Sequence, residues 1–242
     1  MALRKEPRSG DVVRALRAQA SQQKARLLSR FFKTGKGEYG EGDVFWGVMV
    51  PRTRAIVRTF AQLPEKEITA LLRSPYHEVR LAALLMLVYR FEHGDERIRR
   101  HVVAYYLRHT QYINNWDLVD LSAHKILGAY LVDHTSMTTL TRLARSANMW
   151  ERRIAVISTF AFINIGSHKE ALRVAGMLLN DEEDLIHKAV GWMLREVGKR
   201  CGQYLEEQFL KKHYRTMPRT MLRYAIERFP KKRRQKYLLG TV

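Results

Sequence analysis

The sequence predicts an all-α protein built from repeated pairs of helices, and three observations support this fold class. From Pro64 onward, apolar residues recur at helical spacing, and no segment alternates convincingly as a β-strand. Five segments resemble one another in having a charged residue followed by small or apolar ones, about 31–40 residues apart; they begin at Val79, Val119, Arg152, His187 and Pro218. A two-helix period of this length is typical of a HEAT-like α-solenoid, which we expect to be curved with a concave basic face.

Two helical regions and a loop are expected before these repeats. Residues 10–33 show an amphipathic helical pattern that includes Leu16 and Phe31. Residues 34–43 contain four glycines and are expected to form a loop. Pro51 suits the first turn of a helix that runs from Arg52 to about Gln62.

The second helix of each repeat is expected between the five similar segments. These helices are predicted at Arg97–Leu107, Met137–Ala144, Glu170–Leu179 and Tyr204–Lys212. Breaks are predicted at Gly94-Asp95, His134-Thr135-Ser136, Gly166-Ser167 and Asn180-Asp181. We therefore expect one HEAT-like-repeat domain over residues 1–242, with residues 1–10 and 231–242 as candidates for flexible ends.

The charge balance indicates a polyanionic partner. Lysine and arginine number 43 against 24 acidic residues, which gives a formal net charge of +19. Nucleic acid is the first candidate partner and an anionic membrane surface is the second. The longest apolar run, Leu81 to Tyr89, is shorter than the roughly 18–20 residues of a spanning helix, and the N-terminus does not resemble a signal peptide. The single cysteine, Cys201, fits a reducing cytoplasm.

One motif opens a strong helical pattern that runs to about Leu131. It is Asn114-Asn115-Trp116-Asp117-Leu118-Val119-Asp120, in which either asparagine can cap the helix and Asp117 lies in the first turn. Trp116 and Asp120 are four residues apart and share one face of that helix. An acid on the surface of so basic a protein needs a chemical reason or a structural partner.

Equivalent positions in successive repeats of a solenoid line the same face. Arg80, Asp120, Arg153, Lys188 and Arg219 are therefore expected to form a row along one surface. Trp116, Trp150 and Trp192 lie three or four residues from members of this row, on matching helix faces. Trp46 lies in the loop region, where packing is the favoured role.

The glycine-rich loop and the helix after it leave alternatives open. Glu38, Glu41 and Asp43 oppose a phosphate cradle, and their spacing matches no calcium loop, so the glycines are expected to allow tight turns or close approach to a ligand. In the next helix, Arg54 and neighbouring arginines either seat a phosphate near the helix N-terminus or form a solvated basic face.

Several of these motifs resemble the AlkD family of DNA alkylation repair glycosylases. They are Asn115–Asp120, Trp150–Arg153, Lys188–Glu196, the loop 37–43 and Gly47–Pro51. The likeness extends from about Phe31 to Phe229. It implies a HEAT-like solenoid that removes N3- and N7-alkylated purines from duplex DNA as a monomer, without metal or other cofactor, in a bacterial-type cytoplasm, associated with the nucleoid when bound to DNA.

The same resemblance assigns roles to residues. It implies that Trp116, Asp120 and Trp192 form the catalytic group and that Arg153 contacts the DNA backbone. An N3- or N7-alkylpurine is already cationic, so an ionised Asp120 would act on the oxocarbenium-like sugar or orient water, and the indoles would hold that sugar.

The family also implies that the protein contacts the DNA backbone and sugar without a pocket for a flipped base. The further DNA contacts that we expect are Lys188, Arg80, Trp150, Arg54 and Arg219. Met49 and Val50 replace polar residues of some family members.

The same residues are open to other interpretations. Asp120 could instead form a salt bridge between repeats, and His124 has no second histidine or cysteine at zinc-ligand spacing. The basic run Lys231–Lys236 either holds DNA non-specifically or is a solvated tail. A DNA-binding solenoid without catalysis and a protein-interaction scaffold are the alternative functions; a scaffold has no need of +19, and its binding should not fall steeply with salt.

Overall fold

A computed structural model describes residues 6–134 and 136–242, and it divides into two compact units that meet in sequence at Ser122 and Ala123. We call them unit 1, which ends at Ser122, and unit 2, Ala123–Val242. Within the described ranges the structure is helical apart from turns, loops and one isolated bridge between Val44 and Tyr76. This confirms the predicted all-α class.

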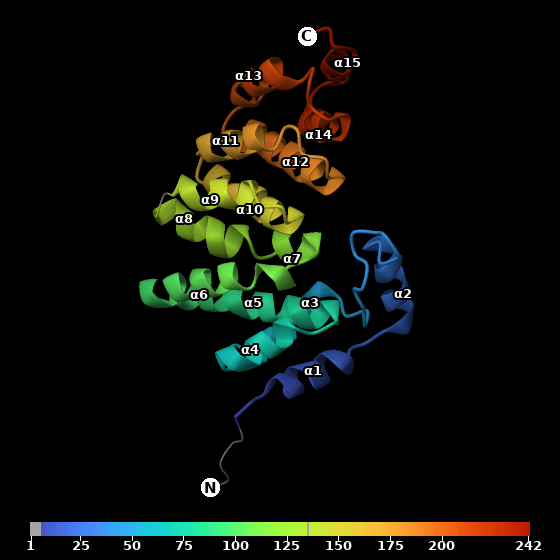
Figure 1. The fold of residues 1–242 in the computed structure, drawn as a ribbon, viewed down its shortest axis with the longest axis vertical. Helices are drawn as coiled ribbons and strands as arrows, with labels where there is room; N and C mark the ends of the chain where they lie inside the picture. Colours follow the sequence, from blue (N-terminus) through green and yellow to red (C-terminus); the bar gives the residue numbers. More distant parts are fainter. Residues whose placement is uncertain (1–5, 135) are drawn as a thin grey trace. The chain divides into compact units, whose positions relative to one another are not determined.

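Unit 1 contains seven labelled α-helices in its described part (Figure 1). Their bounds are α1 (Ser9–Arg17), α2 (Gln22–Phe31), α3 (Val50–Thr59), α4 (Glu65–Leu72), α5 (His77–His93), α6 (Glu96–Arg108) and α7 (Trp116–Asp120), with the short 3₁₀ helix η1 (Thr110–Tyr112) before α7. The N-terminal pattern that we read as one region is two helices, because the chain turns after Arg17 and Ser21 caps α2.

Helix α5 forms the centre of unit 1. Every residue from Val79 to Val88 on this helix is buried, and α3, α4 and α6 pack against it. Burial on nearly all sides explains why its sequence is apolar around most of the helix rather than along one stripe. The helix therefore provides a fixed support, and its N-terminal residue His77 is placed beside the loop that joins α2 to α3.

Unit 2 consists of stacked helices that follow one turn of π-helix (Figure 1). Their bounds are η2 (His124–Gly128, the π turn), α8 (Ala129–Asp133), α9 (Met137–Ala144), α10 (Met149–Asn164), α11 (Lys169–Met177), α12 (Asp184–Arg200), α13 (Gln203–His213), α14 (Arg219–Ala225), the 3₁₀ helix η3 (Ile226–Arg228) and α15 (Lys231–Leu239). The pairs α9–α10 and α11–α12 are packed neighbours, so the predicted helical repeat is present in this unit.

Helices α12 and α14 come unusually close at Gly191. A Cβ atom at this position would lie 2.4 Å from the carbonyl oxygen of Met221 on α14. Only glycine therefore allows the two helices to pack at this distance. The contact fixes the rotation of α12 one residue before Trp192.

The predicted second helices agree closely with α6, α9, α11 and α13. The helix predicted from Trp116 to about Leu131 is different: α7 ends at Asp120, a turn follows, and helical structure resumes as η2 and α8. The basic run near the C-terminus lies in α15, where Tyr237 is buried. None of the described helices is both long and apolar enough to cross a membrane.

Candidate functional site

Helix α7 carries the two central residues of the predicted site. Asn115 caps it, with its Oδ1 accepting a hydrogen bond from the Trp116 amide at 2.8 Å, so the structure selects Asn115 rather than Asn114 as the cap. Trp116 and Asp120 are the first and last residues of the helix, and both are half-buried. Their spacing places them on one face, as the sequence predicted.

Aromatic side chains from the end of α2 hold the Trp116 indole. Its ring stacks on Phe32 at a centroid distance of 5.0 Å and an angle of 17°, and Phe31 packs against it edge-on at 5.7 Å. The indole Nε1 also donates to the Tyr39 hydroxyl at 3.3 Å. Phe32 is buried whereas Phe31 is exposed, so the indole is held from one side and remains partly accessible.

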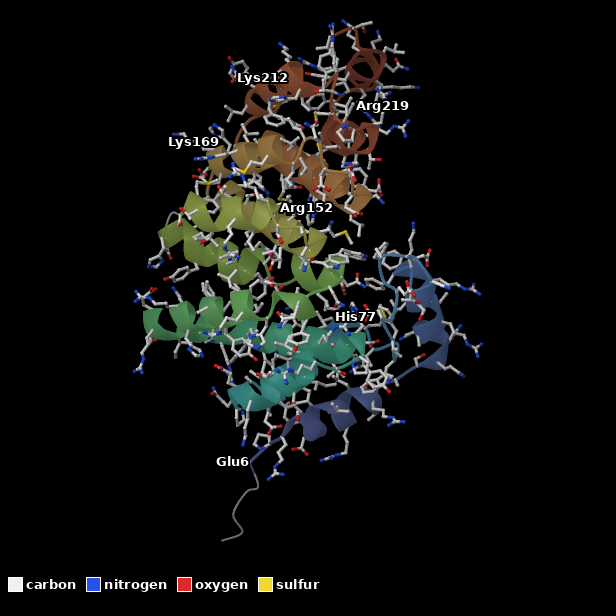
Figure 2. The ribbon with its side chains drawn as sticks, viewed as in Figure 1. Glu6, His77, Arg152, Lys169, Lys212 and Arg219 are labelled. Atoms are coloured by element: carbon white, nitrogen blue, oxygen red, sulfur yellow. The ribbon has the colours of Figure 1, made fainter. Side chains whose placement is uncertain are left out.

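A buried polar network fixes the other side of α7. The imidazole of His77 lies between two carboxylates, with Nδ1 2.8 Å from Asp43 and Nε2 2.9 Å from Asp117. Asn115 Nδ2 donates to Asp43 at 2.8 Å, and Arg80 also pairs with Asp43. We call Asp43, His77, Arg80, Asn115 and Asp117 the His77 network. It links the glycine-rich loop, α5 and α7. Figure 2 labels its central residue, His77.

The protonation state of His77 follows from these partners. Burial by itself would lower the pKa of the imidazole, but the hydrogen bonds and charges of Asp117 and Asp43 raise it to about 9. Burial also opposes ionisation of Asp43, yet the bonds and charges of His77 and Arg80 leave its pKa below the usual value. At neutral pH the network therefore contains an imidazolium that donates to both carboxylates.

The glycine-rich loop is held by its own acidic side chains. Glu38 accepts from the amide of Gly35 at 2.9 Å and Glu41 from the amide of Gly37 at 2.8 Å. Gly37 and Gly42 adopt φ angles of 77° and 83°, where a side chain would be strained. These acids stabilise tight turns, which agrees with the first of the two roles that we left open for the glycines.

A buried carboxylate anchors the chain after this loop. Glu78 accepts hydrogen bonds from the amides of Trp46, Gly47 and Val48 at 2.7–3.1 Å. Three backbone donors satisfy a carboxylate that is only 2% exposed. Trp46 packs on Tyr76 at 4.2 Å, consistent with the packing role favoured from the sequence.

In unit 2, the predicted residues at the start of α10 are largely buried. Trp150 is 9% exposed and Arg153 is 5% exposed, and Arg153 Nη1 donates to the Leu185 carbonyl at 2.6 Å. Arg152 forms a two-pronged ion pair with Asp181, at 2.6 and 3.2 Å. These contacts tie α10 to the segment that leads into α12.

Helix α12 presents Trp192 in a looser aromatic environment. The indole is half-buried and lies 6.0 Å from the ring of Phe160, at an angle of 41°. Phe160 in turn contacts His124 edge-on and lies under the guanidinium of Arg200. His124 is thus part of a packed aromatic group.

The predicted cationic row differs in exposure from one member to the next. Arg80 is buried in the His77 network, which corrects the expectation that it presents its charge on a surface. The sequence could not reveal this because its partner Asp43 lies 37 residues away. Arg54 is half-buried, Lys188 pairs with Asp184 at 2.7 Å, and Arg219 is exposed (Figure 2).

Sequence reasoning missed the His77 network as a unit. Local patterns indicate Asp43 only as part of a loop and Asp117 only as a first-turn acid, and they do not single out His77. The partners are 34 to 72 residues apart, so no local spacing connects them. The available signal was that Asp43, Asn115 and Asp117 all occur in motifs of the family resemblance.

Comparison with solved structures places this helical fold among known ones. The chain is similar to a predicted DNA alkylation repair enzyme from Enterococcus faecalis, with a TM-score of 0.67 and 20% identity over 88% of this chain and 98% of that chain. This likeness defines the fold. None of the curated protein sequences matches this chain.

The family follows from the sequence as a whole. Residues 12–229 match the model of the DNA alkylation repair enzyme family, and this range includes α7, the His77 network and α12. The chain belongs to that family.

Proposed function

We propose that this protein is a DNA glycosylase that hydrolyses the N-glycosidic bond of N3- and N7-alkylated purines in duplex DNA, as a step in base excision repair. The observation that carries the proposal is the Trp116–Asp120 pair on α7, where an indole and an acid lie half-buried on one helix face of a strongly basic protein. Membership in the DNA alkylation repair enzyme family supports alkylated DNA as the substrate.

The chemistry requires negative charge near the sugar. A cationic alkylpurine needs no protonation to leave, and breaking its bond develops positive charge on the deoxyribose. An ionised Asp120 would stabilise that charge or orient the attacking water. Asp43, Asp117 and Glu78 are committed to buried structural contacts, whereas Asp120 keeps part of its surface accessible.

The indoles are proposed to bind the electron-poor sugar. Trp116 is suited to this role because its ring is fixed by Phe32 while part of it remains accessible. An aromatic face stabilises a nearby cation by about 0.5–2 kcal/mol. We propose the same role for Trp192 on α12, from the family resemblance and its half-buried indole.

Binding to DNA is proposed to be mainly electrostatic. The formal charge of +19 provides a long-range attraction for phosphates. Arg54, Lys188 and Arg219 keep accessible surface and are the proposed phosphate contacts. Arg153 and Trp150 are proposed contacts on the family resemblance alone. Both are buried at the start of α10, so little of either side chain is accessible to DNA in this structure.

The test is release of 7-methylguanine from duplex DNA, measured under single-turnover conditions. The Asp120→Asn variant keeps the size of the side chain and removes its charge, so excision should fall by about 10²–10³, or roughly 3–4 kcal/mol. Affinity for DNA should be equal or higher, because a repulsive acid has been removed. Asp133→Asn, an exposed acid on α8, is the matched control and should excise normally.

The outcomes separate catalysis from structure. If Asp120 only forms a salt bridge, Asp120→Asn should lower the melting temperature while the folded protein still excises base. Near-normal excision by a well-folded Asp120→Asn protein would rule out the catalytic assignment. Tight DNA binding with no base release by the unmodified protein would favour a non-catalytic DNA-binding solenoid instead.

A further inference from the structure

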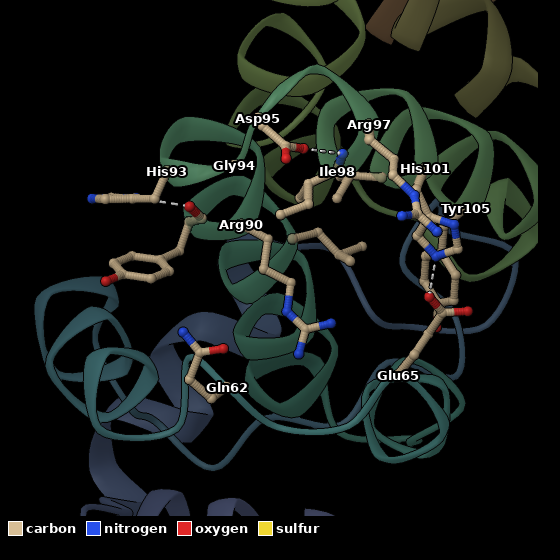
Figure 3. Close-up of a pocket in the computed structure, with 13 residues that line it drawn as sticks. Gln62, Glu65, Arg90, His93, Gly94, Asp95, Arg97, Ile98, His101 and Tyr105 are labelled. Atoms are coloured by element: carbon tan, nitrogen blue, oxygen red, sulfur yellow. Dashed lines mark hydrogen bonds and ion pairs between the residues drawn. The ribbon is translucent and has the colours of Figure 1, made fainter.

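Unit 1 contains a hollow that the proposed catalytic group does not use. It has a volume of about 720 Å³ and lies between the end of α5, the start of α6 and residues 62–65 (Figure 3). This size is typical of sites for small organic molecules and exceeds what a single ion needs. Trp116, Asp120 and Trp192 are not among the residues that line it.

Arg90 brings into this hollow a cation that has no close ion-pair partner among the described residues. Its side chain extends from α5 toward Gln62 and Glu65 (Figure 3), and it is half-buried. The guanidinium donates to the Leu63 carbonyl and, at 3.4 Å, to the Ala61 carbonyl, but it forms no ion pair with a described carboxylate. Burial lowers the pKa of this guanidinium, and the charge of Glu65 opposes the shift. An anion would offset the cost of burying such a cation.

The two carboxylates around the hollow already accept hydrogen bonds from other groups. Glu65 pairs with His101, and Asp95 caps α6 by accepting from the Ile98 amide at 2.9 Å (Figure 3). Arg97 adds a second guanidinium, which is exposed and has no ion-pair partner among the described residues. The hollow therefore combines two arginines with carboxylates that are already engaged.

One wall of the hollow is aromatic. Tyr89 and His93 stack on each other with centroids 4.0 Å apart and an angle of 22°, and both line the hollow. Leu87 and Val102 add apolar side chains to the lining. A flat aromatic wall suits a heterocyclic ring, because a nucleobase stacks on such a surface whatever its hydrogen-bonding pattern.

We propose that this hollow binds a mononucleotide, with its phosphate held by Arg90 and Arg97 and its base against the Tyr89–His93 wall. The two guanidiniums suit a phosphate, and the volume and the aromatic wall suit an attached ring. The ligand therefore needs both parts to bind well. This site is independent of the proposed glycosylase reaction, since it shares none of that reaction's residues.

The test is calorimetric titration of the whole protein with adenosine monophosphate, with inorganic phosphate and adenosine as separate half-ligands. The nucleotide should bind at least about tenfold more tightly than either half, because each adds contacts that the other lacks. Arg97→Gln and Arg90→Gln should each weaken nucleotide binding by about tenfold. Arg100→Gln, on the same helix as Arg97 but outside the hollow, should bind as the unmodified protein does.

Two controls keep the result interpretable. Arg97→Gln removes an exposed side chain, so a loss of binding in this variant does not reflect unfolding. Asp120→Asn should bind the nucleotide normally, which separates this site from the proposed catalytic one. The proposal is overturned if adenosine monophosphate binds no better than phosphate, or if Arg97→Gln and Arg100→Gln weaken binding equally, since that pattern indicates general attraction to a basic surface.

Discussion

The two units position a half-buried tryptophan by different means. In unit 1, Trp116 lies on a helix of five residues, too short to be stable alone, and a stacked Phe32 and the His77 network hold that helix in place. In unit 2, Trp192 lies within the 17-residue helix α12, and its one described aromatic neighbour is the more distant Phe160. The position of Trp116 thus depends on contacts distant in sequence, and that of Trp192 on its own helix.

Each unit also contains a buried ionisable side chain with a shifted pKa, and the two differ in their hydrogen-bond partners. His77 is bonded on both ring nitrogens. Glu206 in unit 2 is 2% exposed, and its Oε1 has no hydrogen-bond partner within the described part of the chain. Burial and the charge of Glu207 raise the pKa of Glu206 to about 8, so it is mainly protonated at neutral pH. His77 is thus stabilised as a buried cation, whereas Glu206 is kept neutral by protonation.

Replacing His77 should cause the largest loss of stability, and that loss should be confined to unit 1. His77→Ala leaves Asp43 and Asp117 buried without their shared cation, and losing one partner of a buried ion pair typically costs about 3–5 kcal/mol. Hydrogen exchange followed by mass spectrometry should show faster exchange in residues 32–120, with unit 2 little changed. His168→Ala, on the α11 cap in unit 2, is the control. Equal destabilisation of both units would contradict a role confined to unit 1.

Raising the pH should test the same network without mutation. The folded-state pKa of His77 is about 9, above its ordinary value of 6.5, so its contribution is fully present below about pH 6.5 and is lost as the pH rises through 9. Linkage makes this contribution about 3 kcal/mol. Protection of α7 amides should fall over this window after correction for the intrinsic exchange rate. The fall should be absent in His77→Ala; its persistence there would assign it to another group.

Glu206→Gln should stabilise unit 2 at high pH. Because the pKa of Glu206 is raised, stability is lost progressively from about pH 4.5 to pH 8, where the unfolded chain ionises this acid and the folded protein keeps it protonated. Removing the ionisable group should therefore add about 2 kcal/mol at pH 9 and little at pH 4. The adjacent Glu207 accepts bonds from Gln203 and Arg233, so Glu207→Gln should be destabilising at both pH values. Denaturant titration measures both; a Glu206→Gln effect independent of pH would show that folding does not raise the pKa of Glu206.

The smallest predicted effect concerns the aromatic support of Trp116. Phe32→Leu keeps an apolar side chain but removes a stacked ring, which is worth about 0.5–1.5 kcal/mol. If Trp116 acts in excision, the single-turnover rate should fall by roughly threefold to tenfold. Phe160→Leu, beside Trp192, should have a smaller effect because that contact is longer and more tilted. The reverse order would mean that Trp192 depends more on its neighbours than its geometry indicates.

Local patterns in the sequence were sufficient for most of the fold. Apolar spacing identified α6, α9, α11 and α13 almost to the residue, because a helix that packs on one side must repeat apolar residues every three or four positions. The break after Asp120 was missed because residues 121–131 remain apolar at helical spacing on both sides of the turn. Apolar periodicity indicates which face of a helix is buried. It does not reveal a turn after which the apolar residues still point to the same side.

The features of the candidate site also separate into those that local sequence spacing predicts and those that depend on tertiary contacts. The sequence by itself determined that Trp116 and Asp120 share a helix face and that Asn115 or Asn114 caps the helix, since both depend on separations of a few residues. Only the tertiary structure decided that Phe32 and Tyr39 hold the indole, that His77 bridges Asp43 and Asp117, and that Arg80 is buried. Those contacts join residues 34 to 84 positions apart, and packing of the whole unit determines which of many possible partners meet.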